Sequence, residues 1–514
     1  MLFNSYPFLL AFLPVTLLGF FGLARLGPTA AAAWLVVASL AFYAWWNPIY
    51  VLLLLASIAF NYAMGGWIGT AALRDRSTSK LLLTLAVAVD LGVLGYYKYA
   101  NFFVDTLASL SGFPLEVARV VLPLGISFYT FTQIAFLVDT YRGKASERNP
   151  VHYALFVTYF PHLIAGPILH HAEMMPQFRD RNVYRATADN FAVGLTIFAI
   201  GLFKKVVLAD GIAPFASSVF ANASVSPPGF FDAWGGALVY TLQLYFDFSG
   251  YCDMAIGLSR LFGIQLPINF DSPYKATNII DFWRRWHITL SRFLRDYVYI
   301  PLGGNRFGKT RRYANLLATM LIGGLWHGAG WTFVAWGGLH GAYLVVNHAW
   351  RHLTGAREGE AGTWAGRNLA RLVTFVAVVF AWVLFRAPDF HTATTIIEGM
   401  IGQNGVSMPN AIAVHFPVLA RRLGSLGVQF TLGGGSEFVR MYAWIAVLLP
   451  LVFVAPNTQE MLGGYRPGIG APHAPPVRWA AWRPSGPWAL ACGCVAAIGF
   501  LSLHRVSEFL YYQF

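Results

Sequence analysis

The sequence is poor in charged residues and in cysteine. Of its 514 residues, 11% are charged and 57% are hydrophobic. Soluble domains carry about 25% charged residues, so this composition excludes a soluble enzyme, a disordered scaffold and a fibrous protein. The three cysteines, Cys252, Cys492 and Cys494, lack the spacing of a disulfide framework or a zinc site. The sequence therefore predicts a polytopic membrane protein.

Long apolar runs recur along the chain. A bilayer crossing needs about 20 apolar residues, and on that criterion we expect roughly 11 to 13 crossings. The first run, near residues 7–25, has no Lys or Arg before it and no small-residue cleavage site, so we expect a retained span rather than a signal peptide. We see no repeat, and we expect one integral membrane domain over residues 1–514, with a core at 1–400 and a less specific region at 400–514.

Basic residues outnumber acidic ones, 36 to 23, which gives a net charge of +13. In a membrane protein this excess favours the positive-inside bias and contact with anionic lipid over nucleic-acid binding. Basic clusters at 74–80 and 142–148 lie inside if the N-terminus is outside, that is, periplasmic. The arginines at 179–185 do not fit this order. Either a segment before this point dips in and returns, or this loop is an exception to the rule. We favour a re-entrant element, since non-spanning backbone is tolerated where protein buries it.

Residues 281–300 predict one amphipathic helix at the membrane interface. At 100° per residue, aromatic and aliphatic residues share one arc and polar residues the other, with His287 at the boundary. The polar arc includes Arg284, Arg285, Ser291 and Arg295. Its guanidinium groups would contact lipid phosphates or hold a phosphate-bearing ligand, and periodicity alone favours the lipid contact.

Residues 314–350 contain no Asp, Glu, Lys or Arg. As one helix they would measure about 55 Å, against a hydrocarbon core of about 30 Å, so the run must break. The glycine-rich stretch 323–330 is the expected place, and it surrounds His327. An ionisable residue inside the bilayer is a functional candidate. The alternative is a histidine hydrogen-bonded between packed helices, with glycines that serve only for packing.

Two aspartates, Asp247 and Asp253, fall inside the apolar segment 233–263. Buried carboxylates relay protons, hold arginines or form ion pairs between helices, and we favour ion pairing. Histidines at 162, 170 and 171 lack carboxylate or cysteine spacing around them, so we expect no metal site.

Six segments together resemble the membrane-bound O-acyltransferase family, in particular its branch of bacterial alginate O-acetyltransferases and teichoic-acid D-alanyl transferases. They are FYAWWNPIY (42–50), LPLGISFYTFTQIAFLVDTYRG (122–143), YFPHLIAGPI (159–168), LYFDFSGYCDMAIGLSRLFGI (244–264), NFDSPYKATNIIDFWRRWHITLSRFLRDYVYIPLGGNR (269–306) and GLWHGAGWTFVAWGGLHG (324–341). The resemblance implies an all-α fold with a transmembrane channel, re-entrant or interfacial helices, a buried catalytic His327 and a second histidine, His287.

The resemblance also implies the reaction. An acetyl group would pass from cytoplasmic acetyl-CoA, with no permanently bound cofactor, to a hydroxyl of an exported polysaccharide or to a periplasmic partner acetyltransferase, in the bacterial inner membrane. The donor would lie against Arg284, Arg285, Arg295, Trp286 and Ser291. Channel support would come from Asp247, Asp253, Tyr245, Trp326 and Trp331. Three alternatives stay open: D-alanyl transfer from a carrier protein, a transporter or flippase, and a non-enzymatic anchor for a periplasmic complex.

Overall fold

The computed structural model describes residues 1–113, 117–355, 363–471, 478–504 and 510. Within these residues the fold is almost entirely helical, with one pair of short parallel strands, β1 (Ser407–Pro409) and β2 (Gln429–Thr431). This confirms the expected all-α class. Part of the region 400–514 lies outside the described residues.

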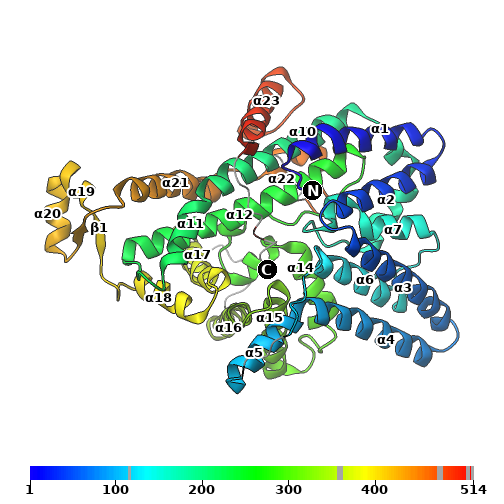
Figure 1. Ribbon diagram of the computed structural model, residues 1–514, viewed down its shortest axis with the longest axis horizontal. Coiled ribbons are helices and arrows are strands. Elements are labelled where there is room, and N and C mark those ends of the chain that lie inside the picture. Colours follow the sequence, from blue (N-terminus) through cyan, green and yellow to red (C-terminus); the bar gives the residue numbers. More distant parts are fainter. Residues whose placement is uncertain (114–116, 356–362, 472–477, 505–509, 511–514) are drawn as a thin grey trace.

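Helices α1 to α4 and α6 form one end of the molecule, and α5 lies apart from them (Figure 1). They pack in pairs: α1 contacts α2, α3 contacts α4, and α6 contacts both α3 and α4. The side chain of Asp75 starts α4 by accepting hydrogen bonds from two backbone N–H groups of the first turn. The bounds are α1 (Leu13–Leu23), α2 (Pro28–Ala44), α3 (Ile49–Ala72), α4 (Arg76–Leu94), α5 (Ala100–Ser111) and α6 (Ile126–Tyr141).

The longest helix, α12 (Phe230–Leu261), lies at the centre and is buried along most of its length. It contacts helices from both halves of the chain. A Cβ atom on Gly201 would lie 2.6 Å from the carbonyl oxygen of Gly250, so α10 and α12 cross with their backbones in contact. The helices around α12 are α10 (Ala188–Phe203), α11 (Asp210–Asn222), α17 (Trp364–Arg386), α18 (Phe390–Met400) and α21 (Gly435–Val454).

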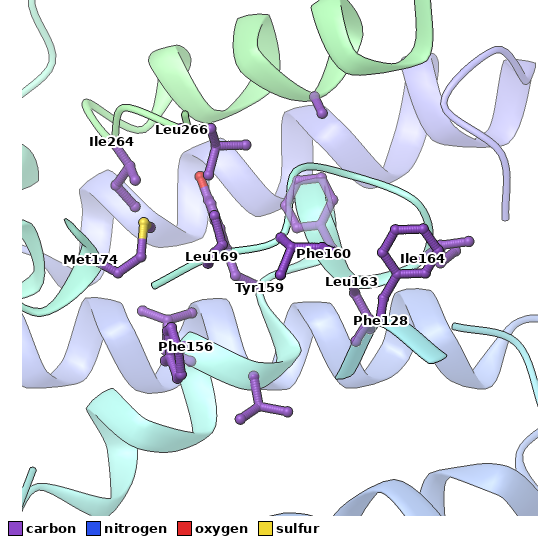
Figure 2. Packing of buried hydrophobic residues seen from close by; sticks show 14 of the residues in the cluster. Phe128, Phe156, Tyr159, Phe160, Leu163, Ile164, Leu169, Met174, Ile264 and Leu266 are labelled. Atoms are coloured by element: carbon purple, nitrogen blue, oxygen red, sulfur yellow. The ribbon is translucent and has the colours of Figure 1, made fainter. Parts of the chain in front are cut away.

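Residues 150–170 enter the protein and return on the same side. The short helices α7 (Pro150–Thr158) and α8 (Phe160–Leu163) are followed by non-helical backbone and then by α9 (His171–Arg179). Arg179 on α9 pairs with Glu147, which precedes α7, at 2.8 Å. Figure 2 shows side chains of this segment within the buried cluster that also contains Phe128 and Ile264. This arrangement is the one expected of a re-entrant segment.

Six helical segments among the described residues are long and apolar enough to cross a membrane, fewer than the 11 to 13 crossings expected from the sequence. The difference has physical causes. The re-entrant segment does not cross, α1, α2 and α6 are short, and α12 is long but less apolar. The six are Ile49–Ala72, Arg76–Ser111, Ala188–Asn222, Trp364–Arg386, Gly435–Val454 and Gly486–His504, the last containing α23 (Gly486–Leu501).

The expectation of a single helix over 281–300 is wrong. The chain forms α13 (Ile279–Arg285), breaks, and continues as α14 (Ile288–Leu294) and a π-helical turn, Arg295–Tyr299. His287 stands at the break with φ +43° and ψ +54°, a left-handed conformation that periodicity cannot reveal. The amphipathic pattern itself holds, because the aromatic arc is buried and the arginines are exposed or half-buried.

The uncharged run 314–350 breaks, as its length requires, within the glycine-rich stretch around His327. Helix α15 (Gly308–His327) ends at His327, and α16 (Trp331–Thr354) begins after three residues. The two helices pack closely: a Cβ atom on Gly324 would lie 2.3 Å from the carbonyl oxygen of Phe333, and one on Gly337 would lie 2.3 Å from that of Met320. Gly324, from the glycine-rich stretch around His327, and Gly337 of α16 therefore permit the close approach of the two helices.

The C-terminal part carries a small unit that projects from the far end of the molecule in Figure 1. It consists of the two strands with α19 (Asn410–His415) and α20 (Pro417–Ser425). Helix α21 leads back from this unit to the body, where α22 (Thr458–Met461) contributes side chains to the buried polar contacts described below.

Candidate active site

His327 is 5% exposed at the C-terminal end of α15. Its imidazole packs against three aromatic rings, with ring centroids 5.1 to 5.3 Å away. These rings belong to Trp326, Trp336 and Phe385, and His287 adds a fourth ring at 6.1 Å. The structure therefore brings together the two histidines that the sequence singled out, although 40 positions separate them.

His287 is fully buried and is fixed by Asn269. The side-chain oxygen of Asn269 lies 3.2 Å from Nδ1 of His287, and it accepts hydrogen bonds from both N–H and O–H of Thr289 at 3.1 and 2.9 Å. The backbone carbonyl of Asn269 accepts from Ile288 at 3.0 Å. One asparagine thus holds the break between α13 and α14 in place.

A cavity of about 200 Å³ opens beside His327. We call it the histidine cavity. The polar side chains on its wall are Lys98, Ser127 and His327, and most of the remaining wall is apolar or aromatic. It is lined by Trp46, Lys98, residues 122–128, Ile164, Ala165, Trp326 and His327.

Lys98 was not identified from the sequence. It lies in a π-helical turn, Gly95–Tyr99, that continues α4, and it is 8% exposed. Its ammonium donates hydrogen bonds to the backbone carbonyls of Trp326 and His327 and to Ser127 Oγ. The sequence feature that could have indicated it is a single lysine at the end of an apolar segment.

A second cavity, of about 480 Å³, lies further back along α15. We call it the arginine cavity. Thr319 and Met320 line it, and at 1.5 Å per residue Met320 precedes Trp326 by about 9 Å along the helix. Helix α15 therefore connects the two cavities. The polar lining consists of Arg284, Ser291, Arg292, Arg295, Tyr299, Thr319 and His348.

The predicted donor residues divide into two groups. Arg284, Ser291 and Arg295 line the arginine cavity, and the Asp296 carboxylate, hydrogen-bonded to the Arg295 guanidinium, raises the pKa of that group. Arg285 and Trp286 do not line it. Arg285 pairs with Asp281 at 2.8 Å and with Asp271 at 3.7 Å, and Trp286 packs against Trp382 in the core.

The two aspartates of α12 lie in buried ion pairs with a π-helical turn, Lys204–Ala209. Asp247 lies 2.6 Å from Lys205, which also pairs with Asp210 at 2.7 Å. Asp253 lies 2.7 Å from Lys204 and accepts further hydrogen bonds from Thr458 and Gln459 of α22. These contacts join α12 to neighbouring elements.

The remaining support residues take different places. Tyr245 is buried against Tyr274, and Trp326 lines the histidine cavity. Trp331 is 53% exposed and packs on Phe102, outside the two cavities. A third buried histidine, His340 of α16, was not identified from the sequence. Neither of its ring nitrogens has a hydrogen-bond partner among the described residues, and aromatic rings surround it.

Fold and site together define a membrane-embedded helical protein with two buried histidines, each at a break between two helices. The sequence profile of the membrane-bound O-acyltransferase family matches residues 106–385, which is more than half of the chain. The chain therefore belongs to this family, as the sequence motifs predicted, and it is a multi-pass membrane O-acyltransferase.

Several characterised or named proteins are similar over most of the chain. A peptidoglycan O-acetyltransferase of Helicobacter pylori is 48% identical over 435 residues, covering 79% of this chain and 81% of the relative. A probable alginate O-acetylase of Azotobacter vinelandii is 47% identical over 406 residues, covering 78% of each. A teichoic acid D-alanyltransferase of Streptococcus thermophilus is 28% identical, covering 51% of this chain and 68% of the relative.

Proposed function

We propose that this protein transfers an acetyl group from acetyl-CoA to a hydroxyl group of an exported cell-surface polysaccharide, with His327 as the general base. One observation carries the proposal: His327 lines an internal cavity, and the helix that it ends leads to a second cavity lined by arginines. A donor and an acceptor would each have a place, and the base would stand in the wall of the acceptor's cavity.

The arginine cavity is the proposed donor site. Coenzyme A carries phosphates, which guanidinium groups recognise by charge-assisted hydrogen bonds. Arg284 and Arg295 are exposed at this cavity and would hold the phosphates, with Ser291 as a further donor. Arg292 and Arg295 each contact a carboxylate through two nitrogens: half-buried Arg292 holds Glu173 of α9 at 2.6 and 2.9 Å, and exposed Arg295 holds its neighbour Asp296 at 2.7 and 3.1 Å. The exposed Arg295 would bind phosphate, whereas Arg292 ties α14 to α9 and would shape the wall.

The histidine cavity is the proposed place of the accepting hydroxyl. The hydroxyl oxygen forms a bond to the thioester carbonyl carbon, and the carbon–sulfur bond breaks. The hydroxyl proton passes to His327 and then to the departing thiolate, so that the products are the acetyl ester and free coenzyme A. His287 would orient the donor or the ring of His327 from 6.1 Å away.

The proposed orientation has a periplasmic N-terminus in the bacterial inner membrane. The basic clusters after α3 and α6 would then be cytoplasmic. The ion pair between Glu147 and Arg179 supports this orientation, because it puts the arginines after α9 on the same side. The arginine cavity would open to the side where acetyl-CoA is made.

The relatives support acetyl as the acyl group. Proteins named as acetylating enzymes are 43 to 48% identical to this chain, whereas a D-alanyltransferase is 28% identical over a shorter part. The names of the acetylating relatives include both alginate and peptidoglycan as acceptors at nearly equal identity. We therefore propose a polysaccharide hydroxyl as the chemical class of acceptor, reached directly or through a periplasmic acetyltransferase partner.

The test uses the full chain in membrane vesicles supplied with radiolabelled acetyl-CoA on one side and alginate or peptidoglycan fragments on the other. Acetyl ester on an acceptor supports the proposal, and label taken up without transfer supports a carrier. The variant His327→Ala is expected to lower ester formation by about 10²- to 10⁴-fold.

The matched control is His340→Phe, on the helix that follows the same break. Because both ring nitrogens of His340 lack partners among the described residues, an aromatic replacement is expected to leave ester formation within a few-fold of wild type. If folded His327→Ala protein still acetylates the acceptor, His327 is not the base.

A further inference from the structure

The last turn of α15 is completed by side chains from a distant part of the chain. The final carbonyl groups of a helix have no partners within the helix, and here the extended backbone at Gly328 supplies only one long bond, 3.4 Å to Gly324. Tyr99 Oη donates to the carbonyl of Leu325 at 2.9 Å. Lys98 donates to the next two carbonyls, those of Trp326 and His327.

The geometry suits a cation. The carbonyl end of a helix carries partial negative charge, which a lysine stabilises. An ammonium group has three protons, and Lys98 has three acceptors within hydrogen-bond distance, namely two carbonyls and Ser127 Oγ. Its hydrogen-bonding capacity is therefore used within the protein. Although Lys98 lines the histidine cavity, its contacts hold the backbone rather than reach for a substrate.

We propose that Lys98 is a positioning residue, which fixes the backbone of His327 so that the imidazole meets an aligned acceptor hydroxyl in the histidine cavity. This inference rests on the proposed function, in which His327 is the base. An alcohol held by a large acceptor must be aligned with the base, and a misplacement of about 1 Å can cost roughly a hundredfold in rate. Water is small and mobile, so its reaction with the thioester depends less on alignment.

The loss of Lys98 is therefore expected to change the choice between two products. With an alcohol the products are the acetyl ester and coenzyme A, and with water they are acetate and coenzyme A. Ester formation is expected to fall about tenfold more than acetate formation. This ratio does not depend on how many molecules are folded, because ester and acetate come from the same active molecules.

The experiment compares wild type with Lys98→Met, which keeps the aliphatic stem, and measures ester and acetate from radiolabelled acetyl-CoA with the same acceptor fragments. Two further variants keep the test sharp if Lys98→Met does not accumulate. Lys98→Gln retains N–H donors, so its ratio of ester to acetate is expected to lie between those of Lys98→Met and wild type. Tyr99→Phe removes the neighbouring bond and is expected to shift the ratio less, in the same direction.

The control is Lys80→Met, which changes an exposed lysine on α4, the helix that leads to Lys98. It is expected to keep the wild-type ratio. If Lys98→Met lowers ester and acetate equally, Lys98 has only a structural role and the inference is wrong. If His327→Ala still forms ester, the proposed function itself fails, so the two failures are distinguishable.

Discussion

The side-chain oxygen of Asn269 and Nδ1 of His287 lie 3.2 Å apart, and this contact determines which nitrogen of His287 carries the proton. The same side-chain atom of Asn269 accepts the backbone N–H of Thr289 at 3.1 Å, and an amide nitrogen could not accept it, so this atom is the amide oxygen. An amide oxygen only accepts, and Nδ1 must therefore donate. The lone pair of the neutral ring then lies on Nε2.

The first prediction concerns this contact. Asn269→Ala leaves three buried donors without their acceptor, each at a cost of about 1–3 kcal/mol. We expect a lower melting temperature in detergent and a lower turnover per folded molecule, because the ring of His287 loses its fixed orientation. Thr289→Ser keeps the hydroxyl and serves as the control. A lower melting temperature with unchanged turnover would limit Asn269 to a structural role.

The second prediction separates two adjacent arginines. Arg284 lines the arginine cavity, whereas Arg285 is engaged with Asp271 and Asp281. The variant Arg284→Gln would lose a charge-assisted hydrogen bond to the donor, which is worth about 1.5–3 kcal/mol. It is therefore expected to raise the KM for acetyl-CoA about tenfold or more, with kcat little changed. Arg285→Gln is expected to leave this KM near its wild-type value. Equal effects of the two variants on KM would contradict the donor assignment.

The third prediction concerns the buried lysines of the turn Lys204–Ala209. Lys205→Met leaves two carboxylates, Asp210 and Asp247, buried without their cation. Such a loss costs about 3–5 kcal/mol, so we expect poor accumulation in membranes and a clearly lower melting temperature.

Lys204→Met is the matched comparison. Its partner Asp253 retains hydrogen bonds from Thr458 and Gln459 at 2.7 and 3.0 Å, so the loss of stability is expected to be smaller. If Lys205→Met is as stable as wild type but inactive, the aspartates have a functional role such as proton transfer, and ion pairing is not their main purpose.

The fourth prediction tests the crossing of α15 and α16. A Cβ atom on Gly324 would clash with backbone at 2.3 Å, whereas one on Gly338 would meet only a flexible Leu321 methyl group at 3.4 Å. Gly324→Ala is expected to cost about 1–3 kcal/mol through overpacking and to lower turnover by displacing His327. Gly338→Ala is expected to be nearly neutral. Thermal unfolding and ester formation would be measured together for both.

Features that depend on length and charge along the chain could be predicted from the sequence. The uncharged run at 314–350 was too long for one crossing, and it breaks next to His327. The misplaced arginines at 179–185 indicated a re-entrant segment, and the ion pair between Arg179 and Glu147 brings the two ends of that segment together. In the first case the length of an apolar run was compared with the thickness of the bilayer, and in the second the order of basic residues along the chain was compared with the positive-inside rule.

Features that depend on tertiary contacts could not be predicted. Lys98 meets the carbonyl of His327 across 229 positions of sequence, and no local pattern pairs them. The helix over 281–300 was expected to be continuous, because a left-handed residue such as His287 leaves no trace in periodicity. Six described segments meet the length and composition of a span, against the 11 to 13 crossings expected, because apolar composition alone does not distinguish a membrane span from a segment buried within the protein.

The hydrogen bonds from Lys98 and Tyr99 to the last carbonyl groups of α15 have a consequence for the limits of the domain. The family match covers residues 106–385 and thus includes both histidines, but it begins after Lys98 and Tyr99. A fragment cut to those boundaries would keep both imidazoles and lose the groups that cap α15, the helix of His327. The smallest unit able to build this site therefore extends upstream of the matched region, at least to the turn Gly95–Tyr99.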